Sequence, residues 1–451
     1  MVFPVVGGDG KPTGYDIDNS LRFEDGDSPE LTFTPSSAGT QTKFTISLWF
    51  KLGNITSTRR VLFGAGDDYL RLADDDNIQW HVTDNGGTGR SFYTSAKIRD
   101  PSAWYHVVAL WDTTQGTDTN RMRLWTNGVE QTANSFTRPS QNATSQTLNS
   151  AAAHKLGGEL NPGNDFHFDG YISEFYFIDG YAYDYQDFGE FDDNGVWIPK
   201  DFTGSYGSNG IRLEFKQTGT SQNSSGIGAD TSGNDNHMSV TNLAATDVTT
   251  DTPTNNFATL NSIAPVGSYA EGNLKYTTST TDGEWSTSTI SISTNAKWYC
   301  EVKAISKTAG SGIYYQLGVT KGNAADFTYR ALYRSDGAIY VGGSNTATFS
   351  SYTDDDIISI AYDSSNRNVT FYKNGNSEGT VTAPSLPSGD DYFFGASSLS
   401  GGNTFVTEWN FGNAPFSISS GNADANGYGN FEYAVPSGYY ALNTKNLAEF
   451  G

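Results

Sequence analysis

One motif occurs twice in this sequence, at two places far apart. Residues 104–128 read WYHVVALWDTTQGTDTNRMRLWTNG, and residues 356–375 read DIISIAYDSSNRNVTFYKNG. Each copy has two strand-like stretches separated by a polar turn, and each ends in Asn-Gly, at Asn127-Gly128 and Asn374-Gly375. Asn-Gly tolerates the positive φ angles of a type I′ hairpin turn. The chain is therefore predicted to contain two separate β regions that share one local plan.

Length and composition extend this prediction to the whole chain. The chain has 451 residues, whereas a single hydrophobic core stops growing at about 250–300 residues. Aromatic residues make up 14% and glycines number 50, which is typical of short strands separated by tight turns. No run of ten or more residues shows a helical period, so helices should be scarce. We predict an all-β protein with two antiparallel β-sandwiches.

Alternating apolar residues and turn-rich stretches predict where the domains begin and end. In KFTISLWFKL, residues 43–52, the side chains of Phe44, Ile46, Leu48 and Phe50 fall on one face. Residues between the two β regions are rich in turns and contain one clear strand, Ile211–Lys216, so they should form an irregular, β-containing strap that packs on the first domain. The predicted divisions are an N-terminal extension (1–14), a first sandwich (15–186), the strap (187–261) and a second sandwich (262–451).

Charge and cysteine content exclude several classes of partner and site. The net charge of −23 disfavours binding to nucleic acid or anionic lipid. The single cysteine, Cys300, allows neither an intrachain disulfide nor a thiolate zinc cluster. The N-terminal residues do not form a signal peptide, and no apolar stretch could insert into a membrane. We expect synthesis in a cytoplasm. The acidic surface either keeps the protein soluble in salty water or contributes ligands for Ca²⁺.

No catalytic residues are assigned from the sequence. It lacks HExxH, GxSxG and P-loop motifs. The acidic string from Glu24 to Glu30 is broken by Gly26 and Pro29, which indicates a solvated turn. Glycosidases need two carboxylates about 5–9.5 Å apart, and no local motif supplies them. A polysaccharide-degrading enzyme is the less favoured alternative, which a carboxylate pair at that spacing on one face would support.

The first sandwich resembles the laminin-G-like, concanavalin A-type jelly roll over about Tyr15 to Tyr185. The resemblance rests on FTISLWFKL, on WYHVVALWD with NRMRLWTNG, and on FHFDGYISEFYFIDGYAY. It implies a calcium site at one edge of the sandwich, with Asp67, Asp68 and Asp169 as candidate ligands. The alternative is that these aspartates only form Asx turns. No other cofactor is expected.

The second sandwich resembles the SPRY domain over about Ser262 to Leu447. The motifs are KWYCEVKA, IYYQLGVT, the hairpin ending in Asn374-Gly375, YFFGAS, and WNFGNAPF followed by VPSGYYALNT. Both resemblances imply concanavalin A-like sandwiches.

A glycan or receptor site requires exposed aromatic side chains beside polar loops. In the first sandwich the candidates are Trp80, Tyr93 and Trp104, and in the second they are Tyr329, Tyr333 and Tyr352. Any one of these rings could instead belong to a core.

Several motifs also resemble structural proteins of marine bacteriophages, such as tail-fibre or head-decoration proteins: VWIPKDFTGSYGSNGIRLEF, IGADTSGNDNHMSVTN, DTPTNNFATLNS and VPSGYYALNTKNL. This resemblance implies a non-enzymatic virion protein that contacts other virion proteins and attaches to a host glycan or receptor. It also implies a homo-oligomer, for which a trimer is one form. The rival is a purely structural decoration protein.

Overall fold

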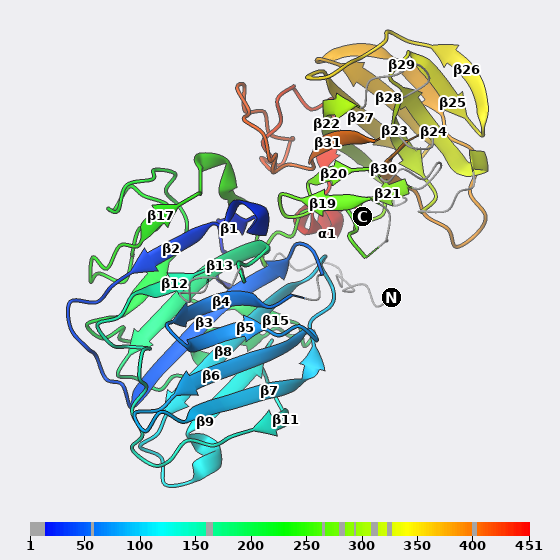
Figure 1. The fold of residues 1–451 in the computed structure, drawn as a ribbon. Helices are drawn as coiled ribbons and strands as arrows, with labels where there is room; N and C mark the ends of the chain where they lie inside the picture. The colour runs from blue at the N-terminus through cyan, green and yellow to red at the C-terminus, as the bar shows by residue number, and fades with distance from the viewer. Residues whose placement is uncertain are drawn as a thin grey trace. The chain divides into compact units, whose positions relative to one another are not determined.

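A computed structural model describes residues 14–55, 58–158, 166–263, 267–278, 285–292, 295–307, 314–322, 327–398 and 404–451. The chain divides into two compact units (Figure 1). The first unit is Pro12–Thr254, and the second contains Asn255–Gly451. The second unit thus begins seven residues before the predicted boundary at Ser262. Most of the predicted N-terminal extension, residues 1–13, lies outside the described residues.

The first unit is a sandwich of two antiparallel sheets, which we call the back sheet and the front sheet. The back sheet contains, in spatial order, β10 (Val129–Glu130), β9 (Met122–Thr126), β8 (Trp104–Asp112), β3 (Lys43–Leu52), β13 (Gly170–Asp179), β1 (Ser20–Phe23) and β18 (Val248–Thr249), with β16 (Ile211–Leu213) paired to β13. The front sheet contains β11 (Ala133–Phe136), β7 (Gly89–Lys97), β6 (Asn77–Thr83), β5 (Asp68–Leu72), β4 (Arg60–Ala65), β12 (His154–Leu156), β2 (Glu30–Phe33) and β17 (Ser239–Thr241).

Alternation along the strands builds the core between these sheets. Phe44, Ile46, Leu48 and Phe50 of β3 are all fully buried in it, as predicted. The front sheet contributes the opposing apolar side chains, and aromatic edge-to-face contacts such as Phe44 against Trp80 join the two layers. The all-β prediction for this unit is confirmed.

The strap residues belong to the first unit up to Thr254. β16 pairs with β13, β17 pairs with β2, and β18 pairs with β1. A short hairpin of β14 (Gly189–Phe191) and β15 (Trp197–Pro199) forms its own two-stranded sheet.

The second unit is also built from two antiparallel sheets. One contains β19 (Ser268–Ala270), β20 (Lys275–Thr277), β31 (Phe405–Asn410), β22 (Lys297–Lys307), β27 (Ile357–Asp363), β28 (Asn368–Lys373) and β29 (Asn376–Thr382), with β32 (Tyr440–Ala441) paired to β22. The other contains β21 (Trp285–Thr287), β30 (Phe393–Ser398), β23 (Tyr315–Thr320), β24 (Arg330–Arg334), β25 (Ala338–Val341) and β26 (Ser344–Thr348). Among the described residues the only α-helix is α1 (Thr444–Phe450), so helix is scarce, as predicted.

The two Asn-Gly turns have the same hydrogen-bond geometry. Asn127 and Gly128 have φ angles of 48° and 73°, and Asn374 and Gly375 have 49° and 78°, so both turns have the predicted positive φ at both positions. The Asn127 side chain accepts a hydrogen bond from the His106 N–H at 2.7 Å, and its own N–H donates to the His106 carbonyl at 2.9 Å. Asn374 does the same with Ile357, at 2.9 and 2.8 Å. Each turn is therefore fixed to the strand before it by backbone and side chain together.

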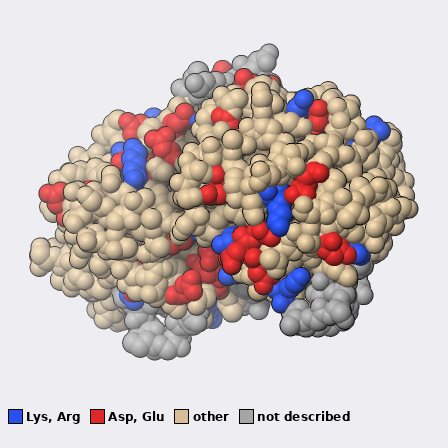
Figure 2. All heavy atoms as spheres, turned by 90° about the horizontal axis from the view of Figure 1, so that it is seen from above, with Lys and Arg blue, Asp and Glu red and all other residues tan. Residues whose placement is uncertain are grey.

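Acidic side chains outnumber basic ones, 50 to 27. Figure 2 shows carboxylates spread over the viewed face, several of them beside a lysine or arginine. No helix in the described part of the chain has the length and apolar character needed to cross a membrane.

Candidate functional site

The outer face of the back sheet is covered by the chain's own segments. Two apolar clusters form there: one joins Trp49, Trp104 and Tyr171 to Ile17, and the other joins β8 and β13 to Phe188 and Phe202. Of the residues that the sequence proposed as ligand contacts, Trp104 lies under this cover, and its Nε1–H donates to Asp251 Oδ1 at 3.2 Å. The predicted exposure of Trp104 is therefore wrong, because a segment far away in sequence packs over it.

A buried ion pair holds these covering segments, which we call the cover, against the back sheet. Lys51 Nζ lies 2.9 Å from Asp251 Oδ2, and the two side chains are only 1% and 2% exposed. Lys51 is on β3, at the centre of the back sheet, while Asp251 follows β18. Two charges this deeply buried are tolerated because each neutralises the other.

His106 makes a second attachment. Its Nδ1 accepts the Trp197 Nε1–H at 3.1 Å, so its proton is on Nε2, 2.8 Å from Ser47 Oγ. The ring also stacks on Trp49, with centroids 4.7 Å apart. Burial lowers the pKa of His106 to about 3, which keeps the imidazole neutral.

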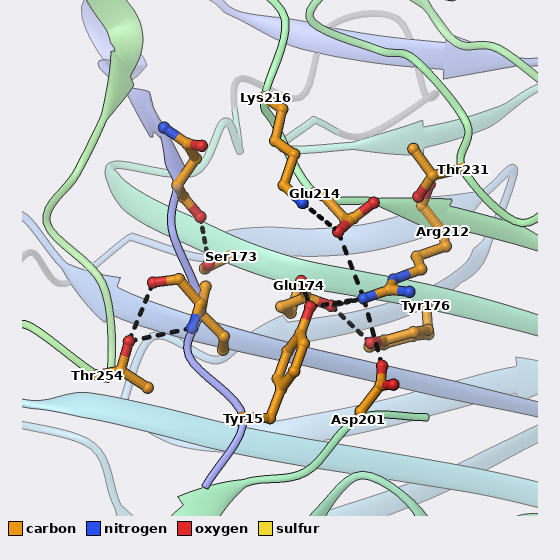
Figure 3. A network of polar contacts seen from close by, with 12 residues as sticks. Tyr15, Ser173, Glu174, Tyr176, Asp201, Arg212, Glu214, Lys216, Thr231 and Thr254 are labelled. Atoms are coloured by element: carbon orange, nitrogen blue, oxygen red, sulfur yellow. Dashed lines mark hydrogen bonds and ion pairs between the residues drawn. The ribbon is translucent and has the colours of Figure 1, made fainter. Parts of the chain in front are cut away.

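Figure 3 shows a polar network at the edge of the same face, centred on Glu174. Glu174 lies in a bulge of β13 with a φ of 45°, a conformation that a non-glycine residue seldom adopts. Its carboxylate accepts hydrogen bonds from Tyr15 Oη at 2.9 Å and from Tyr176 Oη at 2.5 Å. Arg212 Nη2 donates to Tyr15 Oη at 2.6 Å and lies 3.4 Å from Glu174 Oε2. The network thereby joins Tyr15, which lies five residues before the start of β1, to the bulge of β13 and to strand β16.

This network contains a carboxylate pair whose spacing overlaps that of glycosidases. Glu174 and Glu214 lie 3.4 and 3.5 Å from the same Arg212 nitrogen, so their oxygens are at most about 7 Å apart. Burial raises the pKa of Glu174, whereas the Lys216 hydrogen bond, acting against burial, lowers the pKa of Glu214. The Arg212 guanidinium occupies the space between them, where a glycosidic bond would have to lie. The pair therefore holds Arg212, and it does not support the enzyme alternative.

The three predicted calcium ligands have different surroundings. Asp67 is exposed. Asp68 is buried, and its carboxylate accepts the backbone N–H groups of Thr83 at 2.5 Å and of Thr147 and Leu148 at 3.1 Å. Asp68 therefore organises a loop, which is the Asx-type role that the sequence left open.

Asp169 differs from the other two. Its Oδ2 accepts the Asn54 N–H at 3.0 Å, but its Oδ1 is buried and has no hydrogen-bond partner. Burial, together with the nearby Glu24, raises its pKa well above the usual value. A cation or a proton bound to Oδ1 would remove the energetic cost of burying a carboxylate oxygen that has no hydrogen-bond partner. In the described ranges no group of three or more His, Cys, Asp or Glu side chains is placed to hold a metal ion.

The remaining predicted aromatic contacts are divided between core and surface. Trp80, Tyr333 and Tyr352 are buried in the two sandwich cores, so the expectation that they are exposed is wrong. Tyr352 Oη donates to the Tyr333 carbonyl at 3.1 Å, a role inside the core. Tyr329 is half-buried beside Lys321, whose Nζ lies 5.1 Å from the ring centroid. Tyr93 is half-buried on the outer face of the front sheet.

The outer face of the front sheet carries a cluster of polar and aromatic side chains. Along β5, β6 and β7 the inward positions are core residues such as Leu70, Trp80 and Phe92, so the alternating positions point outward. Figure 1 looks onto these strands. The strand register brings six outward side chains together, and we call them the front-face cluster: Tyr69, Arg71, Gln79, His81, Ser91 and Tyr93.

Contacts within the front-face cluster hold its side chains in place. The Arg71 guanidinium lies 3.8 Å from the Tyr69 ring centroid, and its Nε donates to Gln79 Oε1 at 2.9 Å. Gln79 Nε2 donates to Tyr69 Oη at 3.3 Å. His81 stacks on Tyr69 at 5.0 Å, and its Nδ1 is 2.5 Å from Ser91 Oγ. Such a preorganised surface loses little side-chain entropy when it binds a ligand.

Comparison with known proteins finds one family model that matches part of the first unit. Residues 25–181 match the family described as the concanavalin A-like lectin/glucanases superfamily, a laminin G group. The first unit therefore has a concanavalin A-like fold. No curated protein matches the chain.

Among solved structures, the SPRY domain of human HERC1 is similar at 19% identity, covering 30% of this chain and 87% of that one, with a TM-score of 0.26. Domains LG4-5 of the mouse laminin alpha1 chain are 11% identical, covering 97% and 89%, with a TM-score of 0.28. The CBM40 of a Ruminococcus gnavus sialidase, solved with sialyllactose, is 15% identical, covering 35% and 89%, with a TM-score of 0.25.

Of the front-face cluster, one residue was predicted from the sequence as a ligand contact, Tyr93. The signal for the others was present in the period-two alternation of DYLRL, NIQWHVT and GRSFYTSAK. In NIQWHVT this pattern puts Ile78, Trp80 and Val82 on one face, so Gln79 and His81 must lie on the other. The choice of Trp80 was off by one position, which in a strand means the opposite face.

Proposed function

We propose that the first unit is a lectin domain, which binds a glycan through the front-face cluster. The observation that carries this proposal is the contrast between the two sheets. The back sheet is covered by the chain itself, whereas the front sheet presents an ordered set of hydroxyl, imidazole and phenol groups that rest on the buried Arg71 and Gln79. Sugars are bound by such hydrogen-bonding groups together with aromatic rings. The lectin fold supports the same conclusion.

A glycan array followed by titration calorimetry tests the proposal. Wild-type protein is expected to bind a subset of glycans, and Tyr93→Ala should weaken that binding at least about tenfold, which corresponds to about 1.4 kcal/mol. Tyr181→Ala is the matched control, since this tyrosine is 44% exposed and follows β13 of the other sheet. Unchanged affinity in Tyr93→Ala, or equal losses in both variants, would rule out the front face.

The same titration tests for calcium at Asp169. Of the three predicted ligands, Asp169 has a buried carboxylate oxygen without a hydrogen-bond partner, and backbone carbonyls and water would have to complete the shell of a cation there. If Ca²⁺ binds there, EDTA should lower the melting temperature of the wild type and leave that of Asp169→Asn unchanged. Equal melting curves with Ca²⁺ and with EDTA in the wild type would exclude the ion.

We further propose that the protein is a virion component whose lectin domain serves in attachment. Support comes from the phage-like motifs that run through most of the chain. Cryo-electron microscopy of phage particles that carry the chain is the test. A front-face cluster directed to solvent supports attachment, and a cluster packed against the shell or tail supports the structural decoration alternative.

A further inference from the structure

We infer that the ligand of the front-face cluster is an uncharged saccharide. This inference rests on the proposed glycan-binding function and specifies its ligand class. It follows from two observations. The cations on and around the front sheet already form ion pairs or hydrogen bonds within the protein, and the groups that remain accessible to a ligand are mostly uncharged.

The cations of this face are each held by partners within the protein. Arg71 is buried, stacks on Tyr69 and is hydrogen-bonded to Gln79. Lys155 belongs to the same cross-strand row as Tyr69, with Gly64 between them, and its Nζ lies 2.7 Å from Glu30 Oε2. An anionic sugar could bind either cation only by breaking contacts that the fold already makes.

The third cation near this face is also neutralised. Arg90 precedes Ser91 on β7, and its Nε donates to Asp84 Oδ2 at 2.7 Å. The other oxygen of Asp84 accepts the N–H groups of Gly86 and Thr88, both at 3.0 Å, so the carboxylate is fixed in place. Arg90 therefore offers a ligand a neutral ion pair.

The remaining groups of the face are negative or neutral, apart from the exposed Lys97 at the end of β7, whose Nζ donates to the Asp75 carbonyl at 2.9 Å. The exposed Asp67 and the buried Asp68 both act electrostatically on His81. Burial lowers the pKa of His81, so the imidazole is uncharged at neutral pH. Arg71 acts on His81 in the opposite sense, but it is buried beneath the surface. A sugar carboxylate or sulfate at His81 would therefore lie beside two carboxylates, while the nearby cations already have partners within the protein, which makes its binding costly. Uncharged hydroxyl groups, in contrast, match the side chains of Ser91 and the two tyrosines, which are only half-buried.

Paired ligands test the inference. A neutral oligosaccharide that binds on the array is titrated beside its carboxylated or sulfated counterpart of the same linkage, at low and at high salt. The neutral sugar should bind at least about tenfold more tightly, and its affinity should not change with salt, which screens only charged interactions. Equal or tighter binding of the charged counterpart overturns the inference and leaves glycan binding standing. If neither class binds, the proposed function itself fails.

A variant that removes the carboxylate partner of Lys155 provides a second test. Glu30→Gln removes the partner of Lys155, so it should raise affinity for the charged counterpart and leave affinity for the neutral sugar unchanged. Glu190→Gln is the control, because it makes the same charge change at an exposed position on β14. Equal gains in both variants would indicate a general effect of net charge and would contradict the assigned place of Lys155 beside the site.

Discussion

Replacing Asp251 with alanine is expected to lower the free energy of unfolding of the first unit by about 3–5 kcal/mol, because it removes the carboxylate that lies 2.9 Å from the buried Lys51 ammonium. The same change removes the acceptor of the Trp104 Nε1–H. Urea unfolding followed by tryptophan fluorescence measures the loss.

Two comparisons separate this effect from a general one. Glu130→Ala breaks an exposed ion pair with Arg123, whose side chain is 30% exposed, and it should cost less than about 1 kcal/mol. The double variant Lys51→Met with Asp251→Ala removes both buried charges and should recover much of the loss. A cost below about 1 kcal/mol for Asp251→Ala alone would show that the pair does not hold the cover.

Acidification is expected to destabilise the first unit through its two buried histidines. Burial lowers the pKa of His106 to about 3 and the pKa of His154 to about 4, against an ordinary value of 6.5. Both must be neutral in the folded state, since His106 Nδ1 and His154 Nε2 accept hydrogen bonds from Trp197 and from the Asn149 N–H. The unfolded chain binds these protons below about pH 6.5, so stability falls as pH decreases from 6.5 towards 4, by up to about 1.4 kcal/mol per pH unit for each histidine.

Hydrogen exchange, corrected for the intrinsic rate at each pH, measures this effect. Peptides from β8 should lose protection between pH 6.5 and pH 4. Peptides from β22 are the internal control, because all five histidines precede residue 255 and the second unit contains none. Equal losses in β8 and β22 would contradict a histidine origin, and His106→Gln should flatten the dependence in β8.

Local patterns in the sequence predicted the strands and turns well. The alternation in KFTISLWFKL correctly placed four residues in the core, and both Asn-Gly pairs adopt the expected positive φ angles. These features depend only on neighbouring residues, so a single sequence suffices to read them.

Features that depend on contacts between distant segments could not be predicted from local sequence patterns. Trp104 was chosen as an exposed ring, but Asp251, which lies 147 residues further along the chain, covers it. Asp68 was chosen as a metal ligand, whereas its carboxylate binds the backbone of a loop about 80 residues away. The positive φ of Glu174 depends on the bulge between β3 and β13, and no local pattern marks it.

The position of the Lys51–Asp251 pair has a mechanical consequence. The polypeptide leaves the first unit just after Asp251, at Thr254. Tension along the chain therefore reaches first the Thr254 hydroxyl, which is hydrogen-bonded to the backbone of Ile17, and next the Asp251 carboxylate. The ion pair with Lys51 transmits this tension to β3, the strand between β8 and β13. β3 is paired on both sides, whereas the two-residue strand β18 is paired only to β1 at the edge of the sheet. The ion pair thus passes a pulling force to a doubly paired strand before that force reaches the edge strand.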